Sequence, residues 1–197
     1  VTRGRKIRPF QHPSLSRFGP TTVIIAEHSK PLPALADRGV SLATVPQVRG
    51  LPMSQDPKLN SHCKLNCVLA AVQAEKAGAD EGLMLDPLGF VNTTNSCNFF
   101  IVRKGEVWTS TGDYCMNGIT RGKVLEICRE LSIPCHERNF SLVETYGAEE
   151  AFLTGSFGGL TPVRAIDGRL IGTGEGAGPV TTRLRNRYRE IVRGHAG

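Results

Sequence analysis

Apolar residues recur every three or four positions in two segments, residues 61–78 and 120–131, and this spacing predicts helices there. The recurring residues of the first segment are Leu65, Val68, Leu69 and Val72. A third helix is predicted over the terminal segment 178–192. A short fourth helix is predicted over residues 141–146, because a serine and a glutamate three residues apart form a capping box at its start.

Short runs rich in β-branched and aromatic residues predict strands. The runs cover residues 20–27, 40–45, 81–85, 90–91, 98–102, 106–110, 134–140, 151–154, 161–166 and 169–171. Tight turns at residues 103–105 and 167–168 predict hairpins. Prolines predict a linker over residues 29–37, and residues 50–57 are expected to form a loop. Because strands and helices are interspersed and hairpins occur, we expect an α+β fold.

The composition is that of a globular protein. Hydrophobic residues make up 40% of the 197 residues and charged residues 21%, which excludes a wholly disordered chain. No run of about 18 apolar residues occurs, so we expect no membrane-spanning helix. The basic start of the chain is not followed by an apolar segment, so we also expect no signal peptide.

The net charge of +6 is concentrated in two short segments. Residues 1–8 and residues 183–193 each carry +4, and the rest of the chain carries −2. A nucleic-acid-binding protein more often shows a basic stripe with interleaved aromatic residues, whereas the second segment contains only Tyr188. We therefore expect no nucleic-acid partner. The alternative, a basic nucleic-acid-binding protein, predicts retention on heparin that falls steeply with salt.

Six cysteines are present, and no pair has the C-x-x-C spacing of a zinc or redox motif. Cys63 and Cys67 can share one helix face beside His62, but zinc needs more convergent ligands than these. We therefore expect reduced thiols that serve as small apolar side chains, no metal site, and a cytoplasmic location.

Two segments have the pattern of an anion-binding turn. Residues 117–121 precede a predicted helix, and Thr120 is expected to cap it, which leaves the backbone N–H groups of the first turn facing outward. Residues 152–163 place three glycines and three hydroxyl residues after an apolar strand, a pattern that presents donors in a concavity. The alternatives are an ordinary helix cap for the first segment and a flexible connector for the second.

Two further segments are candidates for lining a pocket. Residues 90–100 hold seven small polar residues between apolar ends, which suits either a pocket lining or a surface loop. Lys58 and Lys64 flank the lead into the first predicted helix. A lysine can form a Schiff base with a carbonyl compound when its surroundings favour the neutral amine. A solvated lysine is the alternative for each.

Taken together, the order and spacing of these segments resemble the class IV (fold type IV) pyridoxal-phosphate aminotransferases. This family includes branched-chain and D-amino acid aminotransferases and aminodeoxychorismate lyase. The matching motifs lie at residues 1–4, 68–90, 118–121, 152–168 and 178–181. Because they follow the family's order over nearly the whole chain, the resemblance is far more specific than any single motif.

The resemblance implies a large cofactor-binding domain at residues 37–197 and a remnant of a smaller N-terminal domain at residues 1–36. It implies pyridoxal 5′-phosphate as the cofactor, amino-group transfer between a small amino acid and a 2-oxo acid, and a homodimer. The residues implied to bind the cofactor are Thr93, Gly118, Ile119, Thr120, Gly155 and Ser156, of which Ile119, Thr120 and Ser156 hold the phosphate. Gly155 and Phe157 are implied to lie beside the substrate carboxylate.

Two positions depart from the family's pattern. Asn60 occupies the position of the catalytic lysine when the following helix is aligned without gaps; Lys58 lies two residues before it and Lys64 four after it. The candidate catalytic residues are therefore Lys58, Lys64 and Asn60, and Lys58 needs the smaller shift. Thr93 occupies the position of a glutamate that pairs with the pyridine nitrogen, and a hydroxyl stabilises a protonated nitrogen less well than a carboxylate does.

These departures leave two other functions open. One is a pyridoxal-phosphate-dependent lyase of the aminodeoxychorismate lyase type. The other is a relative that keeps the scaffold as a binding module without catalysis. The family's smaller domain normally contributes many more residues before residues 1–4, including a phosphate-binding arginine, so we expect the chain to be a fragment or a truncated product.

Overall fold

The structure is a computed structural model and describes residues 1–29 and 37–194. The chain divides into two compact units, Val1–Lys30 and Pro31–Gly197, and each is described by itself. The predicted linker over residues 29–37 and the predicted domain boundary after residue 36 fall on residues 30–36, outside the described part of the chain. That boundary therefore stays a prediction.

The first unit holds little regular structure. It contains a 3-10 helix, η1 (Pro13–Leu15), and one isolated antiparallel bridge between Thr2 and Thr21. Beyond this bridge the predicted strand over residues 20–27 is wrong, and Ile24 within it is 88% exposed. A strand forms where its backbone groups pair with a neighbouring strand, and within residues 1–29 no pairing continues past Thr21.

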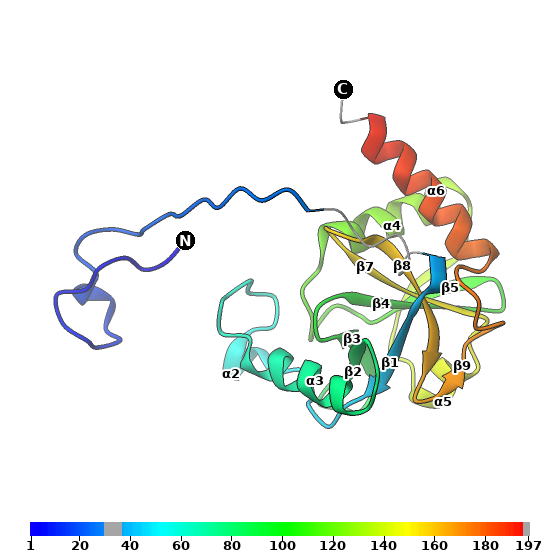
Figure 1. Cartoon of the computed structure of the whole chain (residues 1–197), viewed down its shortest axis with the longest axis horizontal. Helices are drawn as coiled ribbons and strands as arrows, with labels where there is room; N and C mark the ends of the chain where they lie inside the picture. The colour runs from blue at the N-terminus through cyan, green and yellow to red at the C-terminus, as the bar shows by residue number, and fades with distance from the viewer. Residues whose placement is uncertain (30–36, 195–197) are drawn as a thin grey trace. The chain divides into compact units, whose positions relative to one another are not determined.

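The second unit is built on one nine-stranded sheet. Its strands are β1 (Val40–Thr44), β2 (Glu81–Leu85), β3 (Val91–Thr94), β4 (Asn98–Arg103), β5 (Glu106–Thr109), β6 (Cys135–Glu137), β7 (Glu150–Gly155), β8 (Gly159–Ile166) and β9 (Arg169–Leu170). Their order is β3-β2-β1-β8-β7-β4-β5-β6, with β9 beside β8. Because β3 pairs with β4 as well as with β2, the sheet curls into a closed ring that runs from β3 through β8 to β4 (Figure 1).

Parallel and antiparallel pairs are mixed in this sheet. β1 is parallel to β2 and to β8, and β5 is parallel to β6, while the hairpin pairs β4–β5, β7–β8 and β8–β9 are antiparallel. The connection from β1 to β2 runs through a helix, as parallel neighbours require. The mixture confirms the predicted α+β class.

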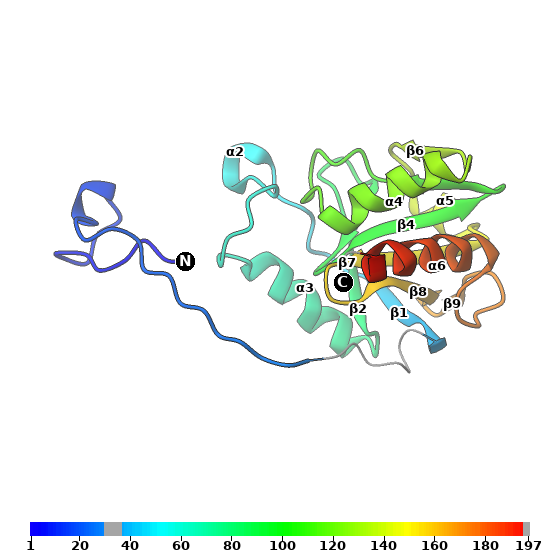
Figure 2. The ribbon, with the colours of Figure 1, turned by 90° about the horizontal axis from the view of Figure 1, so that it is seen from above.

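The helices are α2 (Pro52–Gln55), α3 (Leu65–Lys76), α4 (Ile119–Glu130), α5 (Leu142–Tyr146) and α6 (Pro179–Gly194). α4 and α6 lie side by side over one face of the sheet (Figure 2). Their apolar residues enclose Phe100 and Phe152, whose rings stack with centroids 4.9 Å apart. Strand residues alternate between faces, so Phe99 and Leu153 point instead into the core inside the ring. Within the described residues, no helix has the length and apolar character that a membrane crossing requires.

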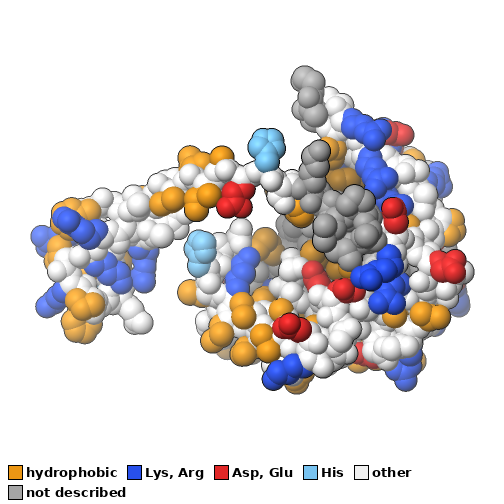
Figure 3. Space-filling model, viewed as in Figure 1, with side chains coloured by type: hydrophobic (Ala, Val, Ile, Leu, Met, Phe, Trp, Pro, Cys, Tyr) orange, Lys and Arg blue, Asp and Glu red, His pale blue; other side chains and the backbone are white. Residues whose placement is uncertain are grey.

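α3 contacts the sheet through its small residues. Ala70 is fully buried against Met84 and Val45, and a Cβ at Gly82 of β2 would lie 2.9 Å from the Ala70 carbonyl oxygen. The larger apolar residues of the predicted helical pattern face outward: Leu65, Val68, Leu69 and Val72 are 69%, 55%, 44% and 38% exposed. We call these four residues the α3 stripe. Figure 3 shows hydrophobic side chains gathered over α2 and α3.

Most predicted elements are confirmed, with shifted ends. The helix expected from residue 61 begins at Leu65, because the preceding amides, such as that of Lys64, form tight turns with carbonyls two residues back. The predicted loop over residues 50–57 contains the single turn of α2. The capping box is confirmed, since Ser141 N donates to Glu144 Oε2 at 2.8 Å. The tight turns are also confirmed, with positive φ at Lys104 and Asp167.

Candidate active site

A pocket of about 400 Å³ opens in the second unit where several connections meet. Its lining comes from the segment before α3, the first turn of α3, the β3–β4 connection, the start of α4 and the end of β7. The lining residues that the sequence analysis singled out are Lys64, Thr93, Gly118, Ile119, Thr120, Gly155 and Ser156. Segments far apart in the sequence thus converge on one cavity, whose volume suits a small-molecule ligand.

The start of α4 presents backbone N–H groups to this pocket. Gly118 is the N-cap, with φ −62° and ψ 148°, and the helix start has no side-chain cap. The first intrahelical hydrogen bond runs from Gly122 N to Gly118 O at 3.0 Å, so the N–H groups of Ile119 and Thr120 have no acceptor within the helix. Together with the helix dipole, they give this end of α4 the properties that suit an anion.

The predicted cap at Thr120 is wrong by two residues. Thr120 is the second residue of α4, only 4% exposed, and its side chain lines the pocket. Gly118 takes the cap position because a side chain there is excluded: its Cβ would lie 2.6 Å from Asn98 Oδ1. The glycine therefore allows the start of α4 to approach β4 closely.

The end of β7 forms the opposite part of the lining. Thr154 is buried at the bottom, Gly155 lies where a Cβ would be 3.2 Å from Cys97 Sγ, and Ser156 follows with an exposed side chain. Phe157 comes next, 61% exposed and outside the lining. Its place beside a substrate carboxylate stays a prediction.

Three polar residues lie in a row across the floor of the pocket. Thr93 of β3 is directly opposite Asn98 of β4, and Asn98 is directly opposite Thr154 of β7. Residues directly opposite in antiparallel strands share a face of the sheet, and all three line the pocket. The Thr93 hydroxyl donates to the Cys97 carbonyl oxygen. This row is therefore polar but uncharged.

Of the two candidate amines, Lys64 reaches the lining. It is the N-cap residue of α3, and its Nζ donates to Asn60 Oδ1 at 2.9 Å. Lys58 is exposed and lies outside the lining, although the residues on both sides of it belong to the lining. Asn60 is also outside the lining and serves as the partner of Lys64. The catalytic roles of these three residues stay predictions.

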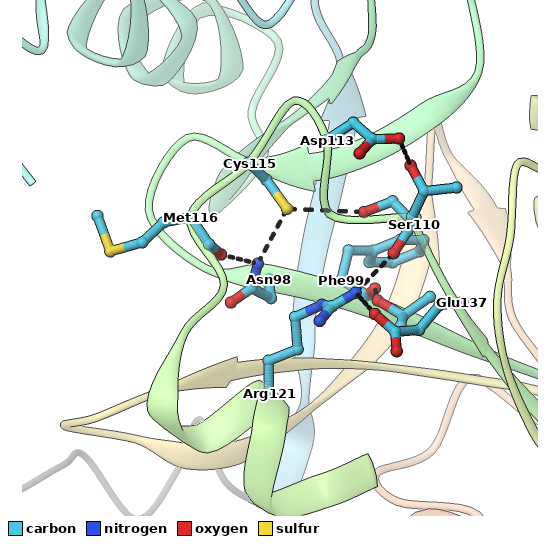
Figure 4. A network of polar contacts seen from close by, with 10 residues as sticks. Asn98, Phe99, Ser110, Asp113, Cys115, Met116, Arg121 and Glu137 are labelled. Atoms are coloured by element: carbon cyan, nitrogen blue, oxygen red, sulfur yellow. Dashed lines mark hydrogen bonds and ion pairs between the residues drawn. The ribbon is translucent and has the colours of Figure 1, made fainter. Parts of the chain in front are cut away.

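A buried arginine network holds the start of α4 in place (Figure 4). Arg121 is 4% exposed, and its Nη2 donates to Ser110 O and to Glu137 Oε2, both at 2.7 Å. Asn98 Nδ2 donates to Met116 O at 2.9 Å in the loop that leads into α4. These contacts tie α4 to β4 and β6, so the N–H groups of its first turn have a fixed position.

Arg49 adds a positive charge that the sequence analysis missed. Its Nε donates to Tyr114 O at 3.1 Å and its Nη1 to Cys67 Sγ at 3.2 Å, and it lines the pocket. None of the ion pairs among the described residues includes Arg49. A single arginine after a short strand has no distinctive spacing, so no sequence signal marks it.

The pocket also contains thiols. Burial, together with the nearby Glu81 carboxylate, raises the pKa of the Cys97 thiol to about 11, so this thiol is neutral at neutral pH. In the part of the chain that the structure describes, no group of three or more His, Cys, Asp or Glu side chains is placed to hold a metal ion. The chemistry available here is anion binding, amine chemistry and neutral hydrogen bonding.

Comparison with known proteins shows which family this chain belongs to. The model of the family described as "Amino-transferase class IV" matches residues 1–166. Branched-chain-amino-acid aminotransferase-like protein 2 of Arabidopsis thaliana is 40% identical over 194 residues, which is 98% of this chain and 34% of that protein. Branched-chain-amino-acid aminotransferase of Pseudomonas aeruginosa is 41% identical over 130 residues, which is 66% of this chain and 42% of that protein.

Solved structures show the same similarity. The branched-chain aminotransferase of Thermoproteus uzoniensis with norvaline gives a TM-score of 0.74 at 36% identity, over 79% of this chain and 52% of that one. The branched-chain amino acid aminotransferase of Thermobaculum terrenum in its PLP form gives 0.78 at 32% identity, over 84% of this chain and 54% of that one. The chain thus spans between a third and about half of the length of these relatives.

Proposed function

Because this chain belongs to the class IV aminotransferase family, we propose that it binds pyridoxal 5′-phosphate and transfers an amino group between a branched-chain amino acid and a 2-oxo acid. The observation that carries the proposal is the convergence of the motif segments on one pocket, at Thr93, Gly118–Thr120 and Gly155–Ser156. The relatives named above are branched-chain aminotransferases, which supports the substrate class.

The residues present fit the phosphate group of this cofactor. The unpaired N–H groups of Ile119 and Thr120 at the start of α4 suit a dianion. The Ser156 hydroxyl, on the lining beside Gly155, can donate to the same group. The Arg49 guanidinium adds positive charge to the lining. Together these residues would supply the donors and the positive charge that a phosphate needs.

When bound, the cofactor supplies an electron sink for the negative charge that develops at the α-carbon of the amino acid. The chain's own contribution is an amine that accepts and returns a proton. We assign this role to Lys64 because it belongs to the lining; its Nζ donates to Asn60 Oδ1, a bond that must be given up before the amine can act in the pocket. Lys58, six residues earlier and between lining residues, is the alternative amine.

Thr93 favours a second candidate function, a lyase of the aminodeoxychorismate lyase type. The row of Thr93, Asn98 and Thr154 puts no carboxylate on the pocket floor. A neutral floor stabilises a protonated ring nitrogen less than a carboxylate does, which weakens the electron sink and disfavours full transamination. Thr93, together with Asn60 at the expected lysine position, also supports a third possibility, a relative that binds ligand without turnover.

We extend the proposal to a homodimer formed through the α3 stripe. Its four apolar residues are exposed next to the first turn of α3, where Asn66 and Cys67 line the pocket. A contiguous exposed apolar face on a helix marks an interaction surface. All six cysteines are free thiols, which agrees with a reducing compartment, and we keep the cytoplasm as the proposed location.

The test is an amino-transfer assay with the protein preincubated with pyridoxal phosphate. We expect glutamate to form from 2-oxoglutarate in the presence of leucine, isoleucine or valine, and no product without the 2-oxo acid. Release of many equivalents of pyruvate per protein from aminodeoxychorismate, without any 2-oxo acid, identifies the lyase instead. Cofactor binding without product from any substrate contradicts both enzymes and leaves the binding module.

A further inference from the structure

One hydroxyl among the lining residues, that of Thr154, has no hydrogen-bond partner within the described part of the chain. Thr154 is 2% exposed, and its Oγ1 is fully buried without any hydrogen bond to the described residues. Leaving a buried hydroxyl unpaired costs free energy, because the group gives up its hydrogen bonds to water and gains none in return. Such an atom in a native structure calls for an explanation.

The neighbours of Thr154 show that the sheet can pair such hydroxyls. The Thr109 hydroxyl donates to Phe99 O at 2.8 Å, and the Thr93 hydroxyl donates to Cys97 O. Both acceptors are backbone carbonyls of β4 or of the turn that leads into it. The Thr154 hydroxyl forms no such bond within the described residues, and Thr154 is itself one of the residues that line the pocket.

Thr154 is paired on both sides within the sheet and shares the pocket lining with the start of α4. It lies within β7, directly opposite Asn98 of β4 on one side and Leu160 of β8 on the other. Asn98 Oδ1 lies 2.6 Å from the point where a Cβ at Gly118 would stand, so this amide reaches the start of α4. Asn98 of the neighbouring strand therefore lies between Thr154 and the start of α4, where the N–H groups of Ile119 and Thr120 are.

We propose that Thr154 is a ligand-binding residue whose hydroxyl is hydrogen-bonded only when the pocket is occupied, here by a polar atom of pyridoxal phosphate. This inference rests on the proposed function for the identity of the ligand. It follows that the unpaired hydroxyl lowers the stability of the ligand-free protein and contributes to the affinity for the ligand. Stability and affinity are therefore expected to change in opposite directions when the hydroxyl is removed.

The test compares Thr154→Val, which keeps the shape and removes the hydroxyl, with Thr154→Ser, which keeps the hydroxyl. We expect Thr154→Val to bind pyridoxal phosphate about tenfold more weakly and Thr154→Ser to stay within about twofold of the unaltered protein. The melting temperature of ligand-free Thr154→Val is expected to equal or exceed that of the unaltered protein. A titration with inorganic phosphate shows which part of the cofactor the Thr154 hydroxyl binds. If it binds the phosphate group, Thr154→Val also binds inorganic phosphate more weakly; if it binds the ring, the affinity for inorganic phosphate is unchanged. Both results support the proposal.

Thr181→Val is the matched control. Thr181 is also fully buried, and its Oγ1 has no partner among the residues that the structure describes, but it lies in α6 outside the pocket. It is expected to leave the affinity for pyridoxal phosphate unchanged. Equal affinity in Thr154→Val and the unaltered protein overturns the proposal, as does an affinity loss that comes with a lower melting temperature. No binding by the unaltered protein overturns the proposed function as well, so the two failures are distinguishable.

Discussion

Gly118 controls the close contact between the start of α4 and β4. A Cβ at this residue would lie 2.6 Å from Asn98 Oδ1, so Gly118→Ala must displace either the amide or the first turn of the helix. We expect this variant to bind pyridoxal phosphate at least about tenfold more weakly, because a small misplacement of binding groups weakens every bond they make. Titration of the cofactor by absorbance measures the effect.

Gly122→Ala is the control on the same helix. A Cβ at Gly122 meets no atom within 4 Å, and Gly122 lies outside the pocket lining. This variant is expected to bind the cofactor normally and to raise the free energy of unfolding by about 0.5–1 kcal/mol, since alanine is the better helix former. If both variants bind equally well, the geometry described for the start of α4 is wrong.

Asp167 makes the stability depend on pH in the acid range. Its carboxylate accepts hydrogen bonds from Thr44 N and Thr44 Oγ1, both at 2.6 Å, and from the Tyr146 hydroxyl at 2.7 Å. Burial raises the pKa of Asp167, but these hydrogen bonds and the nearby Arg169 outweigh it, so the pKa lies below its ordinary value. This contribution to stability is present above the unfolded-state pKa of about 4 and is lost as the pH falls through the folded-state pKa.

Asp167→Asn removes the charge and keeps a residue that tolerates the positive φ of this turn. We expect the variant to lose about 1–3 kcal/mol at pH 7 and to show a smaller further loss between neutral pH and pH 3 than the unaltered protein. Urea unfolding at several pH values measures both quantities. Parallel pH profiles for the two proteins contradict the assignment.

At the scale of elements, Glu150 of β7 fixes the start of α6. The Glu150 carboxylate is 7% exposed and accepts hydrogen bonds from Val180 N at 2.9 Å and Thr181 N at 2.7 Å. It therefore caps the helix from a neighbouring strand and also complements the helix dipole. Glu150→Ala is expected to lower the free energy of unfolding by about 2 kcal/mol, and Glu150→Gln by less, because an amide oxygen still accepts.

Glu175→Ala is the control for this cap. Glu175 is exposed in the loop before α6, so its removal is expected to change the free energy of unfolding by less than about 0.5 kcal/mol. Chemical unfolding followed by circular dichroism compares the three variants. If Glu150→Ala and Glu175→Ala lower the free energy of unfolding by similar amounts, negative charge near the start of α6 accounts for the loss and capping by Glu150 does not.

Local patterns predicted the elements well and their partners poorly. The helices and the tight turns were predictable because apolar spacing, capping residues and turn residues act over a few positions. The strand expected over residues 20–27 failed because a β-branched run specifies no partner, and only Thr21 finds one in the described residues. The α3 helix was predictable from its own residues. The exposure of its larger apolar residues was not, because it depends on which face of the helix packs against the sheet.

The candidate site was predictable in segments and not as a constellation. The turns around Gly118 and Gly155 carry glycine and hydroxyl signals that mark anion binding. Their convergence depends on the register between β3, β4 and β7, which places Thr93, Asn98 and Thr154 in one row. No local signal encodes that register. For the same reason Arg49 could not be predicted. Lys58 needed the smaller shift along the sequence, whereas Lys64 is the lysine that belongs to the pocket lining.

At the scale of the molecule, the α3 stripe predicts self-association. We expect the unaltered protein to sediment as a dimer and Val68→Glu to shift the equilibrium to monomer, because a carboxylate buried in an apolar interface is strongly unfavourable. Gln73→Glu adds the same charge to α3 outside the stripe and is expected to leave the dimer intact. Sedimentation velocity at several concentrations measures the outcome, and a monomer in all three samples contradicts this interface.

We propose that an amine of residues 58–64 reaches a cofactor whose phosphate is held at the start of α4. Borohydride reduction of the protein with pyridoxal phosphate, followed by peptide mass mapping, tests it most directly. We expect one pyridoxyl group per chain, on Lys64 or Lys58, and its loss when the start of α4 is altered by Gly118→Ala. No label, or label spread over exposed lysines such as Lys76 and Lys104, would show that neither Lys58 nor Lys64 reaches the bound cofactor.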